Sequence, residues 1–249
     1  MERVPTGVKG LDKMLEGGLP SGTCILVLGG PGAGKTIFGI QFLYMGAVEY
    51  NEVGLYVSFD ESPVSLRKNM ECFGWNLKRL ETEAKFSFLD LSPIRAFPKE
   101  IEESFVKMNL LETIKKKVQE IQPRRIVIDS LATLVVQFPN VVERRSTVIN
   151  LFQTVMDVGA TGLMLNELPT TYYPGRELQV EEFLAHGVII FRSLEERLRI
   201  FKAIQIEKMR GVSHDSQLRP YTIDNNGLKV FSKENIFVPA TTIPIRTTK

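Results

Sequence analysis

The sequence predicts an α/β fold in which a mainly parallel central sheet is flanked by helices and continues into antiparallel strands near the C-terminus. Three observations predict it. Short apolar runs occur repeatedly, and amphipathic segments of helical length alternate with them as far as residue 165. This alternation is typical of a parallel sheet that is covered on both faces. Beyond that point, strand-like segments are separated only by turns, which favours antiparallel pairing.

The first strand is expected over residues 23–28, whose sequence TCILVL is almost wholly apolar. A parallel strand buried on both faces has this composition. Ser62 and Pro63 predict the start of a helix, because serine caps helix N-termini and proline fits the first turn. Further strands are expected at 54–59, 86–89, 125–128 and 161–165, and helices at 35–49, 63–73, 110–121 and 146–158.

Four C-terminal strands are expected at 187–192, 198–208, 221–223 and 228–231, and Asn225-Asn226-Gly227 predicts a hairpin turn before the last of them. A chain of 249 residues with this pattern is compatible with one domain. We expect residues 1–237 to form that domain and residues 238–249, rich in threonine and proline, to form a tail.

Composition excludes some classes of protein. A net charge of +2 provides no global field that would attract nucleic acid or an anionic membrane. No apolar stretch is long enough to span a membrane, and Cys24 and Cys72 have no metal-ligand spacing, so a cytoplasmic protein is expected. Cys24 is expected in the core, whereas Arg124 and Arg125 are expected on the surface.

The segment GGPGAGKT matches the phosphate-binding motif G-x-x-x-x-G-K-[ST]. In such a loop, backbone N–H groups surround the β-phosphate, the lysine reaches the β- and γ-phosphates, and the hydroxyl binds Mg²⁺. The helix that follows presents its N-terminus to the same anion. The sequence therefore predicts a site for ATP and Mg²⁺ at Gly29, Gly30, Pro31, Gly32, Ala33, Gly34, Lys35 and Thr36.

An acidic residue is expected beside the magnesium ion. Asp129 ends the apolar run RIVI, at the carboxyl edge of the sheet where ligands bind in folds of this kind. We therefore assign it as the Walker B aspartate, which holds Mg²⁺ through water and completes the metal site with Thr36. The alternative is an aspartate that turns the chain or caps the next helix.

Two further pairs of charged residues are candidates for catalysis. Asp60 and Glu61 follow a predicted strand and reach the same edge of the sheet as Asp129. They either orient the attacking water or interact favourably with the dipole at the N-terminus of the next helix. Lys208 is in phase with Ile204 and Ile206, and Arg210 is expected to point the same way. Two cations at a strand end could stabilise charge on a phosphoryl group, although an ordinary basic strand end has the same pattern.

From about Thr6 to Phe231 the chain resembles a KaiC-like ATPase of the RecA superfamily. The resemblance rests on TGVKGLDKMLEGGLPSG, GGPGAGKT, YVSFDESP, VIDS, HGVIIFR and EKMRGVSH, in this order, and the last element is the most specific. It implies a RecA-like P-loop NTPase fold and a hexameric ring with ATP between neighbouring subunits. It also implies that Lys208 and Arg210 reach the neighbour's γ-phosphate and that His214 contacts nucleotide across the same interface.

Three departures from the family pattern matter. Val212 replaces a frequent threonine, and Asp60 replaces the first of two glutamates. Aspartate is one methylene shorter, so its carboxylate lies about 1.5 Å further from a fixed target. A displacement of that order can lower a rate about a hundredfold. Either Glu61 takes over the activation of water or hydrolysis is slow. A second copy of the domain is not seen, which implies a single-domain member.

Residues 169–182 correspond to the channel-lining region of related recombinases. The aromatic and basic side chains there could stack on bases, whereas the acidic ones oppose phosphate binding, so an ordinary loop is favoured. The residues concerned are Tyr172, Tyr173, Arg176, Glu177, Glu181 and Glu182. Just before this region, Asn166 or Glu167 is placed to sense the γ-phosphate.

The leading prediction is a slow Mg²⁺-dependent ATPase that works as a nucleotide-dependent homo-oligomeric ring or switch for an unidentified protein partner. One alternative is a RecA/RadA-like DNA-binding paralogue in recombination or repair. Another is a scaffold that binds ATP without hydrolysing it. Nucleic acid is possible as a partner but not favoured, and no membrane association is expected.

Overall fold

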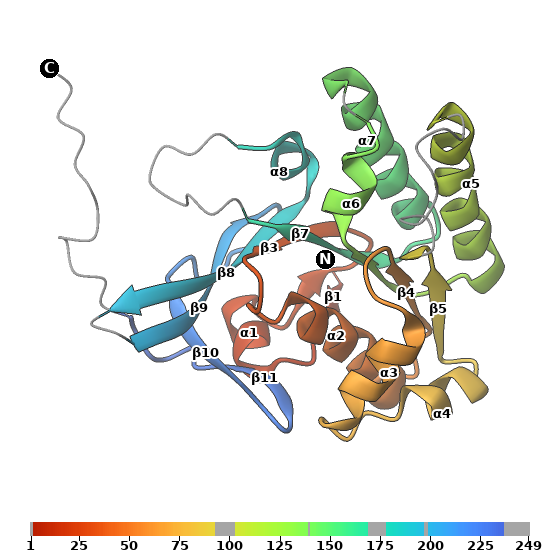
Figure 1. Cartoon of the computed structure of the whole chain (residues 1–249). Coiled ribbons are helices and arrows are strands. Elements are labelled where there is room, and N and C mark those ends of the chain that lie inside the picture. Colours follow the sequence, from red (N-terminus) through yellow and green to blue (C-terminus); the bar gives the residue numbers. More distant parts are fainter. Residues whose placement is uncertain (1, 93–102, 139, 169–177, 197–198, 237–249) are drawn as a thin grey trace, which may run out of the picture.

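The computed structural model describes residues 2–92, 103–138, 140–168, 178–196 and 199–236. Six parallel strands form the centre of one sheet: β3 (Cys24–Gly29), β4 (Gly54–Ser58), β5 (Phe86–Asp90), β6 (Arg125–Asp129), β7 (Thr161–Glu167) and β8 (Gly187–Glu196). Three antiparallel strands follow: β9 (Arg199–Met209), β10 (Arg219–Asp224) and β11 (Gly227–Val230). The order across this nine-stranded sheet is β11-β10-β9-β8-β3-β7-β6-β4-β5 (Figure 1). The predicted fold class is therefore confirmed.

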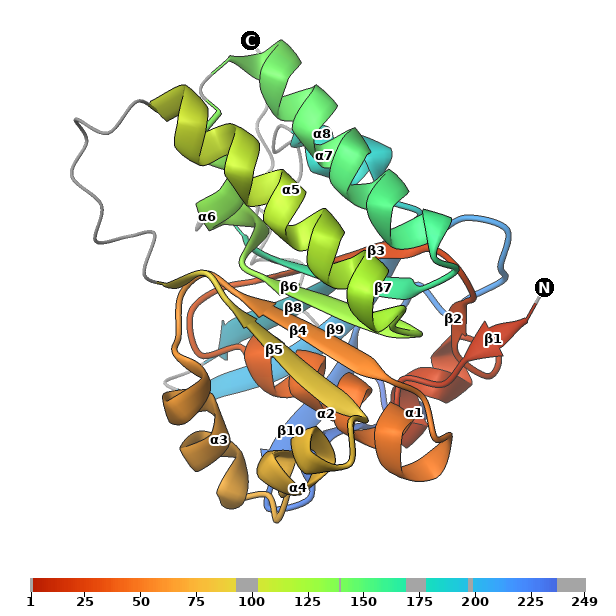
Figure 2. The ribbon, with the colours of Figure 1, turned by 90° about the vertical axis from the view of Figure 1, so that its right-hand side faces the viewer.

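Helices cover both faces of the sheet, as Figure 2 shows. One face carries α1 (Lys9–Met14), α2 (Lys35–Glu49), α3 (Pro63–Glu71) and α4 (Leu77–Thr82), and the other carries α5 (Glu103–Ile121), α6 (Leu131–Val135) and α7 (Val141–Asp157). A short helix, α8 (Val180–Leu184), precedes β8, and β1 (Arg3–Val4) pairs with β2 (Leu19–Pro20) in a separate small sheet. Each face buries its own apolar cluster against the sheet. All six residues of β3 are buried, as expected for its apolar sequence.

Local signals for helix ends and turns correspond well with the structure. The Ser62 hydroxyl accepts a hydrogen bond from the Ser65 N–H and caps α3 as predicted. The Asn140 side chain caps α7 in the same way, so this helix begins at Val141 rather than at the predicted Ser146. The predicted hairpin turn joins β10 to β11. In the described part of the chain, no helix is both long and apolar enough to cross a membrane.

The prediction that Arg125 lies on the surface is wrong. Its side chain is buried and forms an ion pair with Glu52. Its guanidinium also donates to the carbonyl oxygens of Pro5 (2.8 Å) and Phe42 (2.9 Å) and stacks over the Phe42 ring. Arg124, directly before it, is exposed as predicted. Arg125 therefore ties the start of β6 to α2 and to the N-terminal segment.

The predicted face of Lys208 is also wrong, because β9 contains a bulge. Val188 of β8 pairs with Lys208 and Ile189 pairs with Ile206, so the register shifts between them. A bulge of one residue reverses the alternation of side chains. Met209 thus joins Ile206 in the cluster on the α2 face, whereas Lys208 lies opposite Val188, which belongs to the cluster on the α7 face.

Some predictions fall on residues outside the described ones. The proposed tail, residues 238–249, belongs to this group, and so do four members of the predicted channel loop, namely Tyr172, Tyr173, Arg176 and Glu177. Glu181 and Glu182 of the same loop are described and lie in α8, where both are buried.

Candidate nucleotide-binding site

The segment Gly29 to Thr36 connects β3 to α2 at the carboxyl edge of the parallel strands. Gly32 has φ +69° and Gly34 has φ +93°, a backbone conformation that residues other than glycine rarely adopt. A Cβ atom added at Gly30 or Gly32 would meet no atom within 4 Å, so that side of the loop is open. This open, glycine-dependent backbone is what a phosphate chain requires, and ATP fits the residues present.

Lys35 lies inside the curve of the loop. Its ammonium group donates to the carbonyl oxygens of Gly29 (2.7 Å) and Gly30 (3.1 Å). Burial lowers the pKa of Lys35, while the nearby charges of Asp129 and Glu167 raise it. Glu167 pairs in register with Gly29 across β3 and β7, so it ends at the same edge of the sheet. The lysine is thus placed among the groups that the sequence predicts for nucleotide binding.

The two residues predicted to hold Mg²⁺ are in direct contact. The Thr36 hydroxyl donates to the Asp129 carboxylate at 2.8 Å, and the Tyr56 hydroxyl donates to the same oxygen. Burial raises the pKa of Asp129, the hydrogen bonds from Tyr56 and Thr36 lower it, and the charge of Asp60 raises it. Mg²⁺ commonly binds one or two protein oxygens together with phosphates and water. This pair of oxygens therefore fits the ion, which would neutralise charge on the phosphates.

Asp60 and Glu61 face different neighbours. The Asp60 carboxylate accepts a hydrogen bond from the Thr133 hydroxyl of α6 at 2.8 Å, and its charge acts on Asp129. The Glu61 carboxylate accepts hydrogen bonds from Asn69 (2.6 Å) and Ser65, both on α3. Asp60 is therefore hydrogen bonded to α6 and lies close enough to Asp129 for its charge to act there, whereas Glu61 is turned toward α3.

The antiparallel extension supports the loop through contacts that sequence reasoning missed. The Tyr221 hydroxyl of β10 donates to the Ala33 carbonyl at 2.6 Å, although the residues are 188 positions apart. The Lys202 ammonium of β9 donates to the Gly32 carbonyl at 2.8 Å. Tyr56 was also missed, because its strand was interpreted only as a buried element of the sheet. A tyrosine inside such a strand is the only sequence signal, since a buried hydroxyl requires a partner.

Lys208 and Arg210 project to one point, as predicted, and that point is the end of α8. The Lys208 ammonium donates to the carbonyl oxygens of Glu182 (2.8 Å) and Phe183 (3.2 Å). The Arg210 guanidinium donates to the same Phe183 carbonyl at 2.9 Å. Burial and the charge of Arg210 both lower the pKa of Lys208. Among the described residues, neither side chain is hydrogen bonded to the phosphate loop of its own chain.

His214, the third residue predicted to act across an interface, is half-buried. Its Nδ1 lies 3.2 Å from the Val212 carbonyl oxygen, within the turn that follows β9. Among the described residues, it forms no hydrogen bond with the loop of Gly29 to Thr36. The structure thus separates the predicted residues into a loop group around Lys35 and a second group around Lys208.

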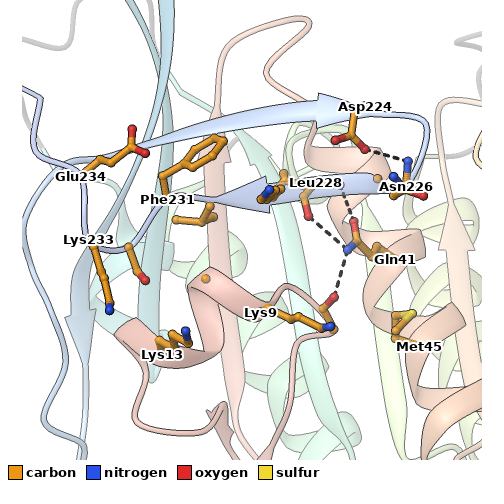
Figure 3. A pocket seen from close by; sticks show the side chains of 16 residues that line it. Lys9, Lys13, Gln41, Met45, Asp224, Asn226, Leu228, Phe231, Lys233 and Glu234 are labelled. Atoms are coloured by element: carbon orange, nitrogen blue, oxygen red, sulfur yellow. Dashed lines mark hydrogen bonds between the residues drawn. The ribbon is translucent and has the colours of Figure 1, made fainter.

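A separate cleft of about 600 Å³ lies beside α1, α2 and β11 (Figure 3). Lys9, Lys13 and Lys233 line it, and Gln41 lies within it, hydrogen bonded to Leu228. None of the residues predicted to bind nucleotide belongs to its lining. This cleft is therefore not the predicted ATP site.

The sheet order, the phosphate loop and the adjoining aspartate define a P-loop NTPase of the RecA-like type. The family model described as the KaiC ATPase matches residues 4–235. The chain therefore belongs to the KaiC family and is an ATP-binding ATPase domain.

Individual relatives agree with this assignment. The chain is 36% identical over 229 residues to the circadian clock oscillator protein KaiC of Synechococcus elongatus, covering 92% of this chain and 44% of that protein. It is 36% identical over 231 residues to the KaiC protein of Thermostichus vulcanus, with 93% and 44% covered. The chain thus spans less than half the length of these curated relatives.

A solved structure matches over its whole length. The crystal structure of a KaiC-like protein from Pyrococcus horikoshii has a TM-score of 0.79 and 32% sequence identity to this chain. The match covers 92% of this chain and 99% of that one. A single KaiC-like domain of this size therefore occurs by itself in a solved structure.

Proposed function

We propose that the chain hydrolyses ATP slowly with Mg²⁺, at sites shared between neighbouring copies in a homo-oligomeric ring, and that the bound nucleotide acts as a switch for a protein partner. The observation that carries the proposal is the position of Lys208 and Arg210. Both meet at the Phe183 carbonyl and neither contacts the phosphate loop of its own chain among the described residues. Two cations that do not contact the phosphate loop of their own chain can stabilise the negative charge of a phosphate bound to another copy.

Within one copy, the proposed roles follow from the contacts at the loop. Backbone N–H groups of Gly30 and of residues 32–36 surround the phosphates, and Lys35 pairs with the β- and γ-phosphates. Thr36 and Asp129 hold Mg²⁺ by their oxygens. Asp60 orients the attacking water, because it is the carboxylate whose charge acts on Asp129. The aspartate is short for this task, and hydrolysis is slow for that reason.

Single-turnover hydrolysis tests the assignment of the water-orienting acid. Asp60→Ala is expected to lower the rate about tenfold or more, because the carboxylate whose charge acts on Asp129 is lost. Glu61→Ala serves as the matched control and is expected to stay within about threefold of the parent, since Glu61 is turned toward α3. Equal hydrolysis rates for the parent and both variants would contradict the assignment, and an absence of hydrolysis by the parent would favour a scaffold that only binds ATP.

Mixing two inactive proteins tests whether the site is shared. A Lys35→Ala protein lacks a working loop but keeps Lys208 and Arg210, whereas an Arg210→Ala protein has the opposite defect. Mixed rings contain some interfaces in which both groups are intact, so activity should recover on mixing. No recovery, despite mixed assembly confirmed by mass, would argue against catalysis in trans.

Binding to single-stranded nucleic acid is not part of the proposal. The described residues that follow the 169–177 segment include Glu181 and Glu182, which are acidic and buried. They offer no cation to a phosphate backbone. Salt-dependent binding of single-stranded DNA in the presence of ATP would overturn this exclusion.

A further inference from the structure

The short helix α8 has an inverted distribution of polar and apolar side chains. Glu181 is 0% exposed and Glu182 is 5% exposed, whereas the neighbouring Phe183 is 55% exposed. A surface helix ordinarily turns its apolar side chains toward the core and its charges toward water. Polar contacts on its buried side therefore help to set the orientation of α8, together with the packing of Leu184 against the apolar cluster on the α7 face.

The main contact on that side is an ion pair with α7. The Arg144 Nε atom donates to Glu181 Oε1 at 2.6 Å, and Arg144 lies in the first turns of α7, which Asn140 caps. The second carboxylate oxygen of Glu181 is buried and has no hydrogen-bond partner among the described residues. Burying a carboxylate is costly, and apolar side chains often replace such pairs without loss of stability. A pair kept at this cost is a candidate for fixing a geometry.

The geometry that this pair can fix is that of two carbonyl groups. The carbonyls of Glu182 and Phe183, one and two residues after Glu181, accept the hydrogen bonds of Lys208 and Arg210. A shift or rotation of α8 would move these carbonyls and both cationic head groups with them. The bulge in β9 contributes as well, because it turns Lys208 toward α8.

We propose that Arg144 and Glu181 are positioning residues, whose ion pair holds α8 so that its carbonyl groups aim Lys208 and Arg210 at the γ-phosphate of the neighbouring copy. This inference rests on the proposed function, because it requires that the two cations act in trans. A competing role exists. The Gln179 side chain, directly before α8, lies 3.5 Å from Asn166 at the end of β7, so α8 could instead act on the phosphate loop of its own chain.

Complementation distinguishes the two roles. Glu181→Gln keeps the size of the side chain and removes its charge, and it is expected to lower turnover about tenfold or more with ATP affinity unchanged. Mixed with Lys35→Ala, which supplies intact cations, it should recover activity beyond the sum of the separate proteins. Mixed with Arg210→Ala, it should give no more than their average, because both proteins are defective in the same half of the site.

The opposite pattern would overturn the proposal. Recovery with Arg210→Ala but not with Lys35→Ala would assign Glu181 to the loop of its own chain. Recovery with neither, in a protein that melts at the parent temperature, would also contradict it. If Lys35→Ala and Arg210→Ala do not complement each other, the proposed function, a site shared between copies, is contradicted. This result does not depend on the mixtures that contain Glu181→Gln.

A second variant and a control keep the test independent of folding defects. Arg144→Lys keeps the positive charge but loses the guanidinium geometry, and it should show the same complementation pattern with a smaller loss of turnover. An Arg144→Lys protein that recovers activity with Arg210→Ala but not with Lys35→Ala would overturn the proposal. Arg145→Gln changes the exposed neighbour of Arg144 and should leave turnover within about twofold of the parent.

Discussion

The phosphate loop and the Lys208–Arg210 pair differ in where their partners lie. The loop residues contact side chains from across the sheet, including Asp129 of β6 and Tyr221 of β10. Lys208 and Arg210 instead donate hydrogen bonds to backbone carbonyls of the adjacent α8, and the charge of Glu182 also acts on Lys208. The first group is organised for a ligand by its own chain, whereas the second places two cations side by side at the end of α8.

This difference indicates how binding and catalysis are divided. A copy of the chain by itself contains the groups that the proposal assigns to ATP and Mg²⁺. The cations assigned to the transition state belong to another copy, whereas the water-orienting Asp60 belongs to the same one. Apart from Asp60, changes in the loop half should therefore alter folding or ATP affinity, and changes in the α8 half should alter turnover alone.

The largest effect is expected on the free energy of unfolding when Arg125, at the start of β6, is replaced. Arg125→Met removes the ion pair with Glu52 and leaves the carbonyl groups of Pro5 and Phe42 without their donor. Breaking a buried pair in this way costs about 3–5 kcal/mol in the free energy of unfolding. Urea denaturation measures it. Arg124→Met, at the exposed neighbouring position, should stay within about 0.5 kcal/mol of the parent. Similar losses for both arginines would contradict the role of Arg125.

The next effect concerns ATP affinity. Lys35→Ala removes the cation at the centre of the loop and should weaken binding of ATP–Mg²⁺ about a hundredfold, or roughly 2.7 kcal/mol. Titration calorimetry measures the change, and the melting temperature without nucleotide should be unaffected. Lys233→Ala is the matched control, since this exposed lysine lines the separate cleft. An unchanged affinity in Lys35→Ala would remove the loop from the binding site.

Arg210→Ala should show the reverse separation. Turnover should fall about tenfold to a hundredfold, because a cation that stabilises the transition state is lost. The affinity for ATP–Mg²⁺ should stay within about threefold of the parent, since the loop half is intact. Steady-state hydrolysis and calorimetry on the same preparation give both values. A loss of ATP affinity with unchanged turnover would show that Arg210 binds the ground state of the nucleotide. It would contradict the division between a loop half for binding and an α8 half for turnover.

The smallest effect is a pH dependence that arises at Asp129. Burial raises the pKa of this carboxyl group above the ordinary value of 3.8, and Mg²⁺ binds its ionised form. Lowering the pH from 7.5 to 5.5 should therefore weaken ATP–Mg²⁺ binding, because less of the carboxyl group is ionised. Because the pKa is raised in the folded state, the same group lowers the free energy of unfolding as the pH rises from 3.8 through that value.

Asp129→Asn is the reference for this measurement, because ATP itself binds protons in the same range. The variant should bind ATP–Mg²⁺ more weakly at both pH values and show a smaller difference between them. The pH dependence of ATP–Mg²⁺ binding should be larger in the parent than in the variant. If it is no larger, or has the opposite sign, ionised Asp129 is excluded as the metal ligand.

Local sequence patterns predict the centre of the fold well. The apolar composition of residues 23–28 predicts β3, and the cap at Ser62 predicts the start of α3, because each signal depends only on neighbouring residues. The phosphate loop, bounded by β3 and α2, is predicted for the same reason. The helices α1, α4, α6 and α8 were missed, since five or six residues are too few to show a helical period.

Features that depend on distant parts of the chain were predicted poorly. The bulge that turns Lys208 toward α8 depends on how β8 pairs with β9, and no local pattern in β9 reveals it. Arg125 looks like half of a surface pair until Glu52 and the end of α2 close over it. The contact between Tyr221 and Ala33 likewise arises only when the antiparallel strands are placed beside the loop.

The central claim is that one copy of the chain does not contain a complete catalytic site. Hydrolysis per subunit, measured with ATP–Mg²⁺ over a wide range of protein concentration together with the mass in solution, tests it most directly. The account predicts that activity per subunit appears only as the oligomer forms and falls toward zero on dilution to monomer. A monomer that hydrolyses ATP at the full rate per subunit would contradict it.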